Sequence, residues 1–544
     1  MNNASRAGRA GVCALAVAGA LLTAAVSTTA NAALKEPLKL DSGLLGGSLE
    51  AAPGIRAFKG IPFAAPPVGA LRWQAPQPVA KWSGVRDASK YANVCIQPPG
   101  PSNGPAARLN IANMQGSPPL SEDCLYLNVW TGAASANEKR PVMIWWFGGA
   151  FTEGGGSAPL YDGTALAKKG VVVVTMNYRL GPYGFFVHPA LTAESAHRAS
   201  GNYGLMDMLA SARWVKNNIA AFGGDPNNVT VFGQSAGAMA IASLVASPES
   251  KGLFKRAISQ SGAWMGLGLA GAMRTREQAE EVGLKAANEA GAKTAAELRA
   301  MSADDVTAKF RSAGMIVDGW VIPEDPTAVF ASGRQNAVDV LVGSNKEELS
   351  FGPPATAERF VAGAKMRWGD AADEFLKLYP HATDAEAAAS QIASSSDSTF
   401  WLMRQYADYQ AKKGNKAYLY FFTQNPPAPS GQPPFPAAHA SEVPYVFNNL
   451  GQLPLFPDRS SAELSGKSAP DKKLADEMSS YWTNFAKTGN PNGPRLPTWK
   501  PHQPGKSDDA AILDADPASE KLPTEARLAF VDRAFARQQE HAAH

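Results

Sequence analysis

The chain has 544 residues, of which 51 are Lys or Arg and 48 are Asp or Glu, so its formal net charge at pH 7 is +3. This balanced composition gives no electrostatic basis for binding nucleic acid or an anionic membrane surface, and neither partner is predicted. Beyond the first 32 residues no stretch approaches 18 uninterrupted apolar residues, so stable membrane insertion is not expected.

The first 32 residues have the pattern of a cleaved signal peptide. A positive start, an apolar segment and a small-residue cleavage site follow one another at Arg6 and Arg9, residues 11–26 and Ala30-Asn-Ala32. The pattern predicts export, to the periplasm or the medium. Residues 33–544 contain no low-complexity linker, charge block or repeat that would divide them, so a single domain is expected there.

Two cysteines, Cys95 and Cys124, remain after the leader is removed. In an exported protein an even pair favours one disulfide, here closing a loop of about 30 residues. A metal site is the alternative, but two thiols this far apart with no neighbouring His do not match the spacing of zinc ligands. No metal ion or cofactor is predicted.

Short apolar runs alternate with amphipathic segments along the chain. Strands are predicted at residues 142–147, 171–176, 229–232, 257–259, 338–342 and 417–422, and helices at residues 203–219 and 238–245. Alternation of this kind is typical of an α/β fold with a mainly parallel sheet covered by helices. In such a sheet the reactive side chains lie at the carboxyl ends of the strands.

A G-x-S-x-G sequence, Gly233-Gln-Ser-Ala-Gly237, lies between the strand at 229–232 and the helix at 238–245. This is the setting of a nucleophile elbow, a tight turn that exposes the serine hydroxyl. The glycines are needed because backbone and helix approach too closely for side chains. The pentapeptide alone also arises by chance, so the prediction that Ser235 is a nucleophile depends on its setting.

A second glycine-rich segment, Phe147-Gly-Gly-Ala-Phe151, follows the strand at 142–147. Small residues there would let backbone N–H groups approach a substrate carbonyl, as in an oxyanion hole. The alternative is an ordinary glycine-rich turn. The comparable loop of lipases begins with His, and Phe147 therefore departs from that form while leaving the backbone donors available.

An acid and a base complete the predicted set. Glu347 and Glu348 follow the strand at 338–342, where either carboxylate could orient an imidazole; a solvated turn is the alternative. His439 lies at the end of a stretch with six prolines among residues 426–436, which predicts a rigid extended loop. An incidental histidine on a surface loop is the other interpretation, but the order Ser, acid, His along the chain favours a general base.

Taken together, these residues resemble the type-B carboxylesterases of the α/β-hydrolase fold, a family related to cholinesterases and bacterial para-nitrobenzyl esterases. The resemblance runs from about Lys39 to the C-terminus, although Gly132 stands where proline or a polar residue is usual. The motifs that carry it are Phe58–Phe63, Glu122–Trp130, Asn177–Leu180, Phe222–Gly237, Gln260–Gly262 and Trp482–Asn492.

The resemblance implies a role for individual residues. It identifies Ser235 as the nucleophile and His439 as the base, and it selects Glu348 over Glu347 as the acid because "NKEELSF" is similar to the family's segment. It also implies a disulfide between Cys95 and Cys124. The implied oxyanion donors are Gly149, Ala150 and Ala236. Ser261 resembles a serine that hydrogen-bonds near the triad; a polar residue at a strand end is the alternative.

The predicted substrate is a neutral carboxylic ester. Cholinesterases resemble the chain but carry Glu where Gln234 precedes the nucleophile, and they hold a tryptophan for quaternary ammonium between the two cysteines. Residues 96–123 contain no aromatic side chain, so a cation–π site from this loop is absent from the sequence. Two rival functions are a lipase or polyester hydrolase acting at an interface, and a non-catalytic binding module similar to neuroligins, although Ser235, Glu348 and His439 are all present.

Overall fold

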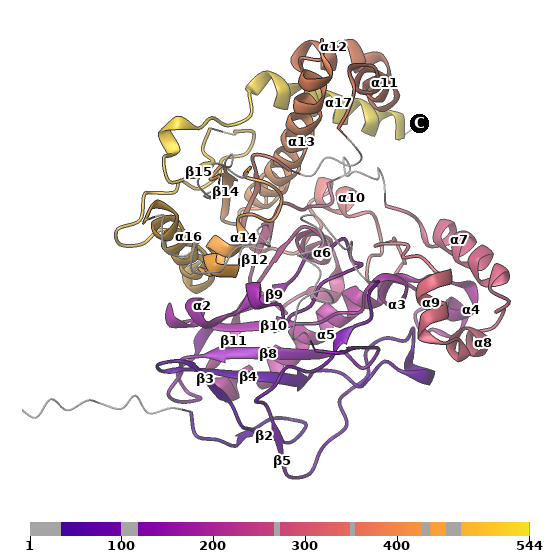
Figure 1. Ribbon diagram of the computed structural model, residues 1–544, viewed down its shortest axis with the longest axis vertical. Helices are drawn as coiled ribbons and strands as arrows, with labels where there is room; N and C mark the ends of the chain where they lie inside the picture. The colour runs from indigo at the N-terminus through magenta and orange to yellow at the C-terminus, as the bar shows by residue number, and fades with distance from the viewer. Residues whose placement is uncertain are drawn as a thin grey trace, which may run out of the picture. The chain divides into compact units, whose positions relative to one another are not determined.

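A ten-stranded mixed sheet organises the computed structural model of the chain (Figure 1). The structure describes residues 34–98, 118–265, 273–348, 354–425, 436–452, 469–506 and 508–542. The predicted signal peptide, most of the loop between the two cysteines and the proline-rich residues 426–435 lie outside these ranges. All the elements below belong to the unit Ala33–His544.

The strands of this sheet lie in the order β15-β14-β13-β12-β11-β9-β10-β8-β4-β3. Neighbours from β15 to β10 pair in parallel, whereas β8, β4 and β3 pair antiparallel. In chain order the strands are β3 (Leu49–Ala52), β4 (Ile55–Pro62), β8 (Tyr126–Thr131), β9 (Arg140–Trp146), β10 (Val172–Met176), β11 (Gly224–Gln234), β12 (Arg256–Gln260), β13 (Asp339–Asn345), β14 (Ala417–Phe422) and β15 (Ala511–Leu513).

The six predicted strands are all present, as β9 to β14. Their sequences are rich in apolar residues, because a parallel strand covered by helices is buried on both faces. Every residue of β10 and β14 is buried. β11 begins at Gly224, five residues before the apolar run, and its pairing with β9 shifts register between Gly224 and Val229.

Helices cover this sheet. The helix α5 packs on β11, α6 on β11 and β12, α16 on β9 and β11, and α13 on β13 and β14. In Figure 1, α11, α12, α13 and α17 lie together at the top of the view, and α13 reaches down to pack on β14. The α-helices are α2 (Thr164–Lys168), α3 (Gly181–Phe185), α4 (Pro189–Glu194), α5 (Tyr203–Asn218), α6 (Ala236–Val245), α7 (Arg276–Glu289), α8 (Ala295–Ala300), α9 (Ala303–Lys309), α10 (Pro326–Ala331), α11 (Ala357–Trp368), α12 (Ala372–Leu378), α13 (Asp384–Lys412), α14 (Val443–Val446), α16 (Ala469–Thr488) and α17 (Glu525–Ala542).

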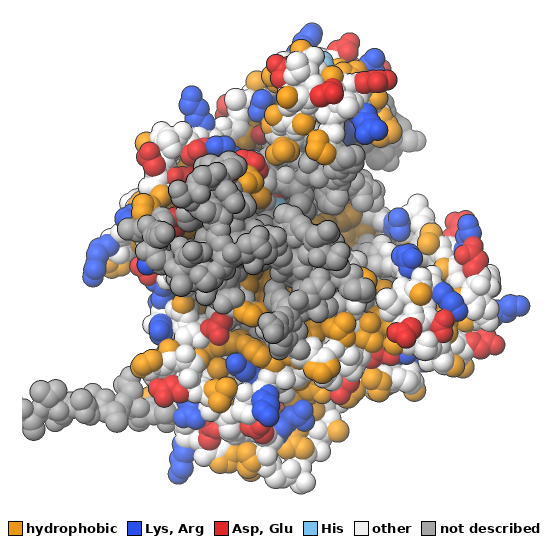
Figure 2. Space-filling model, in the orientation of Figure 1, with side chains coloured by type: hydrophobic (Ala, Val, Ile, Leu, Met, Phe, Trp, Pro, Cys, Tyr) orange, Lys and Arg blue, Asp and Glu red, His pale blue; other side chains and the backbone are white. Residues whose placement is uncertain are grey.

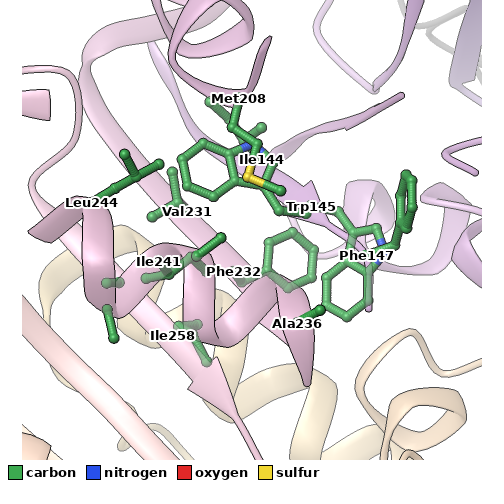
Figure 3. Close-up of a cluster of buried hydrophobic side chains, with 14 of the residues drawn as sticks. Ile144, Trp145, Phe147, Met208, Val231, Phe232, Ala236, Ile241, Leu244 and Ile258 are labelled. Carbon is green, nitrogen blue, oxygen red and sulfur yellow. The ribbon is translucent and has the colours of Figure 1, made fainter. Parts of the chain in front are cut away.

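The core under the predicted nucleophile is apolar and tightly packed. Figure 3 shows side chains of β9, β11, β12 and α6 in one buried cluster that includes Trp145, Phe232 and Ile241. The ring centroids of Trp145 and Phe232 are 4.8 Å apart. Burial of such large side chains stabilises the strand ends and the start of α6 by about 2 kcal/mol each, which fixes the turn between them.

Two small sheets complete the N-terminal part. One contains β1 (Leu38–Lys39), β2 (Leu44–Gly46) and β5 (Val85–Asp87), and the other pairs β6 (Val94–Cys95) with β7 (Leu120–Ser121). Beside the second sheet, Cys95 forms a disulfide with Cys124, as the cysteine count and the family resemblance predict.

Charged side chains of both signs are interspersed on the face shown in Figure 2, in line with the balanced composition. Within the described residues, no helix is both long and apolar enough to cross a membrane.

A buried histidine and two aspartates form a charge cluster that does not include any of the predicted site residues. His502 is buried between two carboxylates, with Nε2 2.7 Å from Asp408 at the end of α13 and Nδ1 2.8 Å from Asp509. Burial lowers the pKa of His502, but the hydrogen bonds and charges of the two aspartates outweigh it and raise that pKa to about 9. The cluster joins α13 to the segment that follows α16.

Because of this cluster, we expect the protein to lose stability at alkaline pH. Because the folded pKa of about 9 exceeds the unfolded value of 6.5, the stabilisation is complete below pH 6.5 and is lost as the pH rises through 9. The lost free energy of unfolding should be on the order of 3 kcal/mol. Denaturant titrations at pH 6 and pH 9.5 should give a large difference for the wild type and a small one for His502→Gln. The exposed His197→Gln is the control, and an equal pH dependence in His502→Gln would contradict the prediction.

Candidate active site

The predicted site residues follow three neighbouring parallel strands. β11, β12 and β13 end at the same edge of the sheet, since Gln234 is paired with Gln260 and Gln260 with Gly343. Ser235 and Ser261 come directly after β11 and β12, and the two glutamates come just after β13. The carboxyl edge of the sheet therefore gathers side chains that are far apart in the sequence.

Ser235 lies in a strained turn between β11 and α6. Its φ of 53° and ψ of −122° are unfavourable for a residue with a side chain, and its N–H donates to the carbonyl of Gln260 at 2.8 Å. A Cβ at Gly233 would lie 2.5 Å from the carbonyl oxygen of Trp146, and one at Gly237 would lie 2.0 Å from the same oxygen. These close approaches explain why the turn needs glycine on either side of the serine.

The imidazole of His439 contacts Glu348. His439 Nδ1 is 2.5 Å from Oε2 of Glu348, whose side chain is buried. The other oxygen, Oε1, accepts the N–H of Asn345 at 2.8 Å, and the N–H of Glu348 itself donates to the hydroxyl of Ser396 on α13 at 2.8 Å. Both the carboxylate and its backbone are therefore held in place.

Glu347, the neighbouring glutamate, makes no contact with the imidazole. Its backbone N–H donates to the carbonyl of Ala437 at 3.0 Å, which ties the turn after β13 to the segment before His439. Its side chain is partly exposed, and burial raises the pKa of its carboxyl group. Of the two carboxylates that the residue pattern left open, the structure brings only Glu348 to His439.

On its other side the imidazole contacts Gln234 rather than Ser235. His439 Nε2 is 2.9 Å from Nε2 of Gln234, and the Ser235 hydroxyl has no hydrogen-bond partner among the described residues. Burial lowers the pKa of His439, but the charge and hydrogen bond of Glu348 outweigh it, so the net pKa is raised above the usual value.

The glycine-rich loop after β9 adopts the left-handed backbone region at three successive residues. The φ angles are 110° at Gly149, 53° at Ala150 and 62° at Phe151. Among the described residues, the N–H groups of Gly149 and Ala150 have no acceptor, and the same holds for Ala236, the first residue of α6. Three backbone donors near the serine are thus unused, which is what an oxyanion would require.

The loop approaches the serine closely. A Cβ at Gly148 would lie 3.0 Å from Cβ of Ser235 and 2.7 Å from Oε1 of Gln234, so only glycine fits there without displacement. Phe147, which departs from the lipase form, is buried and stacks on Tyr178 with ring centroids 4.3 Å apart. The phenol of Tyr178 also donates to the carbonyl of Phe147 at 2.8 Å.

A second layer beneath the site was not predicted from the sequence. Glu442, three residues after His439, is fully buried and accepts hydrogen bonds from Asn345 at 2.6 Å and Gln260 at 3.0 Å. Burial raises the pKa of its carboxyl group. The only signal for Glu442 in the sequence was its position three residues after His439.

The hydroxyl of Ser261 is buried and has no partner in the described part of the chain.

A small cavity beside the disulfide is lined by Arg72 and Arg179, but these side chains are already paired with Glu122 and Asp207. Within the described ranges, no group of three His, Cys, Asp or Glu side chains could hold a metal ion.

Known proteins with similar sequences include esterases. Residues 36–531 match the carboxylesterase family. The chain is 40% identical to a fumonisin B1 esterase of Sphingopyxis macrogoltabida, over 88% of this chain and 87% of that protein. It is 36% identical to the para-nitrobenzyl esterase of Bacillus subtilis, over 86% of this chain and 94% of that protein.

Solved structures of esterases also resemble this chain. A PNB esterase superposes with a TM-score of 0.72 at 34% identity, covering 90% of this chain and 99% of that one. A carboxylesterase of Geobacillus stearothermophilus superposes with a TM-score of 0.72 at 33% identity, covering 88% and 96%. The family resemblance and the α/β-hydrolase fold predicted from the sequence are confirmed.

Proposed function

The chain belongs to the carboxylesterase family and is a carboxylic ester hydrolase, and from this premise we propose that it cleaves neutral esters through an acyl-enzyme on Ser235. Ser235, Glu348 and His439 form the proposed triad. The observation that carries the proposal is the contact of 2.5 Å between Glu348 and His439 beside the strained turn that exposes Ser235.

The proposed reaction begins with attack by the Ser235 hydroxyl oxygen on the ester carbonyl, while Nε2 of His439 takes the hydroxyl proton. The buried carboxylate of Glu348 stabilises the imidazolium that forms. The negative charge on the carbonyl oxygen is met by the N–H groups of Gly149, Ala150 and Ala236. His439 then returns the proton to the departing alcohol. In the second half of the reaction a water molecule gives a proton to His439 and attacks the acyl group. The acid is released as the Ser235 oxygen leaves and takes that proton back.

The Ser235 hydroxyl and His439 are not hydrogen-bonded within the described residues, so one bond of the proposed triad has to form. Catalytic hydrogen bonds in free enzymes are often long and tighten only when substrate binds. The two residues lie at the same edge of the sheet, and Gln234, which contacts His439, is the residue before Ser235. A side-chain rotation is therefore the movement that the proposal needs.

A neutral ester suits the groups around the proposed nucleophile. Gln234 carries no charge where a carboxylate would favour a cationic substrate, and residues 96–123 lack the aromatic side chain that a quaternary ammonium group would need. The relative from Sphingopyxis macrogoltabida is named for fumonisin B1, so this compound is a second candidate substrate.

A panel of esters tests the proposed specificity. We expect hydrolysis of p-nitrobenzyl and short-chain p-nitrophenyl esters below the micelle concentration, and at least tenfold slower turnover of a choline ester of equal acyl length. Fumonisin B1 is assayed in parallel, and Ser235→Ala protein supplies the background rate. A steep rise in rate when long-chain esters form micelles would instead support an interfacial lipase.

We also propose that residues 1–32 are removed during export. The disulfide between Cys95 and Cys124 supports this, because such bonds persist in oxidising compartments. Mass spectrometry of the natively produced protein, with and without reductant, tests both points, since it gives the N-terminal residue and the oxidation state of the thiols. A retained leader or two free thiols would contradict the proposal.

A further inference from the structure

The side chain of Gln234 lies between the imidazole of His439 and the glycine loop after β9. It is buried, with 5% of its surface exposed. One end of its amide is 2.9 Å from Nε2 of His439, and the other end lies against Gly148, where a Cβ would be 2.7 Å from Oε1. The amide is thus confined at both ends.

The contact with Gln234 fits a neutral His439 whose proton lies on Nδ1. An amide N–H pointing at Nε2 requires a lone pair there, because two N–H groups cannot donate to each other. The single proton of the neutral ring then lies on Nδ1, where it is donated to Glu348 at 2.5 Å. This tautomer, in which Nε2 carries no proton, is the one that a general base for Ser235 must adopt.

We propose that Gln234 is a positioning residue for the esterase reaction: in the free enzyme its amide occupies Nε2 of His439, keeps the imidazole in the base tautomer, and yields that position to the Ser235 hydroxyl when substrate binds. This inference rests on the proposed function. The exchange breaks one hydrogen bond and forms another, so it needs little free energy. The Ser235 hydroxyl is available for it, having no partner among the described residues.

Several ionisable groups face His439. Glu348 follows β13, Glu442 lies in the same turn as His439, and both carboxylates favour the imidazolium. Tyr420 on β14 is buried near both carboxylates, and burial keeps its pKa well above the usual value, so it stays neutral. An N–H donated to Nε2 acts in the opposite direction, because the imidazolium has no lone pair there to accept it.

Two substitutions test the inference through the pH dependence of kcat/KM. Gln234→Met keeps the length of the side chain but removes the donor, so the pKa of the acid limb should rise by about half to one pH unit. Gln234→Glu places a carboxylate that accepts a proton from Nε2, so that pKa should rise further. Gln335→Met changes a buried glutamine in the segment between α10 and β13; it is the matched control and should leave the limb unchanged.

A second readout does not depend on turnover. In a Ser235→Ala background, nitrogen NMR of the imidazole should show the proton on Nδ1 and a pKa that rises on Gln234→Met; His439→Gln identifies the signal among the seven histidines. An unchanged or lower pKa in Gln234→Met would overturn the inference. If Gln234→Met fails to fold, Gln234→Leu, which also removes the donor without adding a charge, is compared with the wild type in its place. Full activity of Ser235→Ala would instead overturn the proposed function.

Discussion

Ser235→Ala should lower kcat by about six orders of magnitude, to the level of the background reaction. The hydroxyl oxygen is the atom that bonds to the acyl group, and alanine has no replacement for it. The free energy of unfolding should stay within about 0.5 kcal/mol of the wild type, because the hydroxyl makes no hydrogen bond within the described residues. Steady-state hydrolysis of a p-nitrophenyl ester and denaturant titration measure the two quantities.

Ser243→Ala is the matched control for this experiment. Ser243 lies on α6, the helix that begins beside Ser235, and its hydroxyl is buried without a partner. Removing that hydroxyl should leave turnover within about twofold of the wild type. An organophosphate should label the wild type and Ser243→Ala at one serine, and mass spectrometry should find the label on Ser235. Labelling elsewhere, or near-normal activity of Ser235→Ala, would contradict the proposed nucleophile.

Glu348→Gln should reduce kcat by about four orders of magnitude. A neutral amide no longer stabilises the imidazolium, and its N–H₂ group can face Nδ1 and favour the wrong tautomer of His439. Because the carboxylate also accepts the N–H of Asn345 at 2.8 Å, the glutamine oxygen can keep that bond and the fold should persist. The pH profile of the residual activity should lose the acid limb that the raised pKa of His439 produces in the wild type.

Glu347→Gln is the control that the chain itself provides. Both glutamates follow β13 and differ by one position, but the side chain of Glu347 is partly exposed and does not contact His439. Its replacement should change kcat/KM by about twofold or less. The reverse result would mean that the register of this turn is wrong by one residue. Two near-normal variants would mean that the acid comes from another part of the chain.

The proposed roles of Ser235 as nucleophile and Glu348 as acid depend on the structure at the carboxyl edge of the sheet. The strained turn at Ser235 persists because glycines on either side permit contacts that no side chain could make. The carboxylate of Glu348 is buried but retains two hydrogen-bonded neighbours, Asn345 and His439, and the backbone N–H of Glu348 donates to Ser396. A buried charge of this kind is tolerated because it is paired, and the same pairing is what would stabilise an imidazolium during the reaction.

Local patterns in the sequence determined much of this protein. The apolar runs of β9 to β14 could be recognised in the sequence because a strand buried on both faces consists largely of apolar residues. The turn around Ser235 could be predicted because its strand, its glycines and its helix are adjacent in the chain. The family motifs extended this to the proposed acid and base and to the disulfide, since each lies in a segment that resembles one of the family's motifs.

Only the tertiary structure decided which side chains meet. From the residues alone Glu347 and Glu348 were equivalent, and the contact that separates them joins residues 91 positions apart. The bond between Gln234 and His439 spans 205 positions, that between Gln260 and Glu442 spans 182, and that between Asp408 and His502 spans 94. Local sequence specifies the conformation of a segment, but contacts of this range depend on strand order and register, which packing of the whole sheet sets.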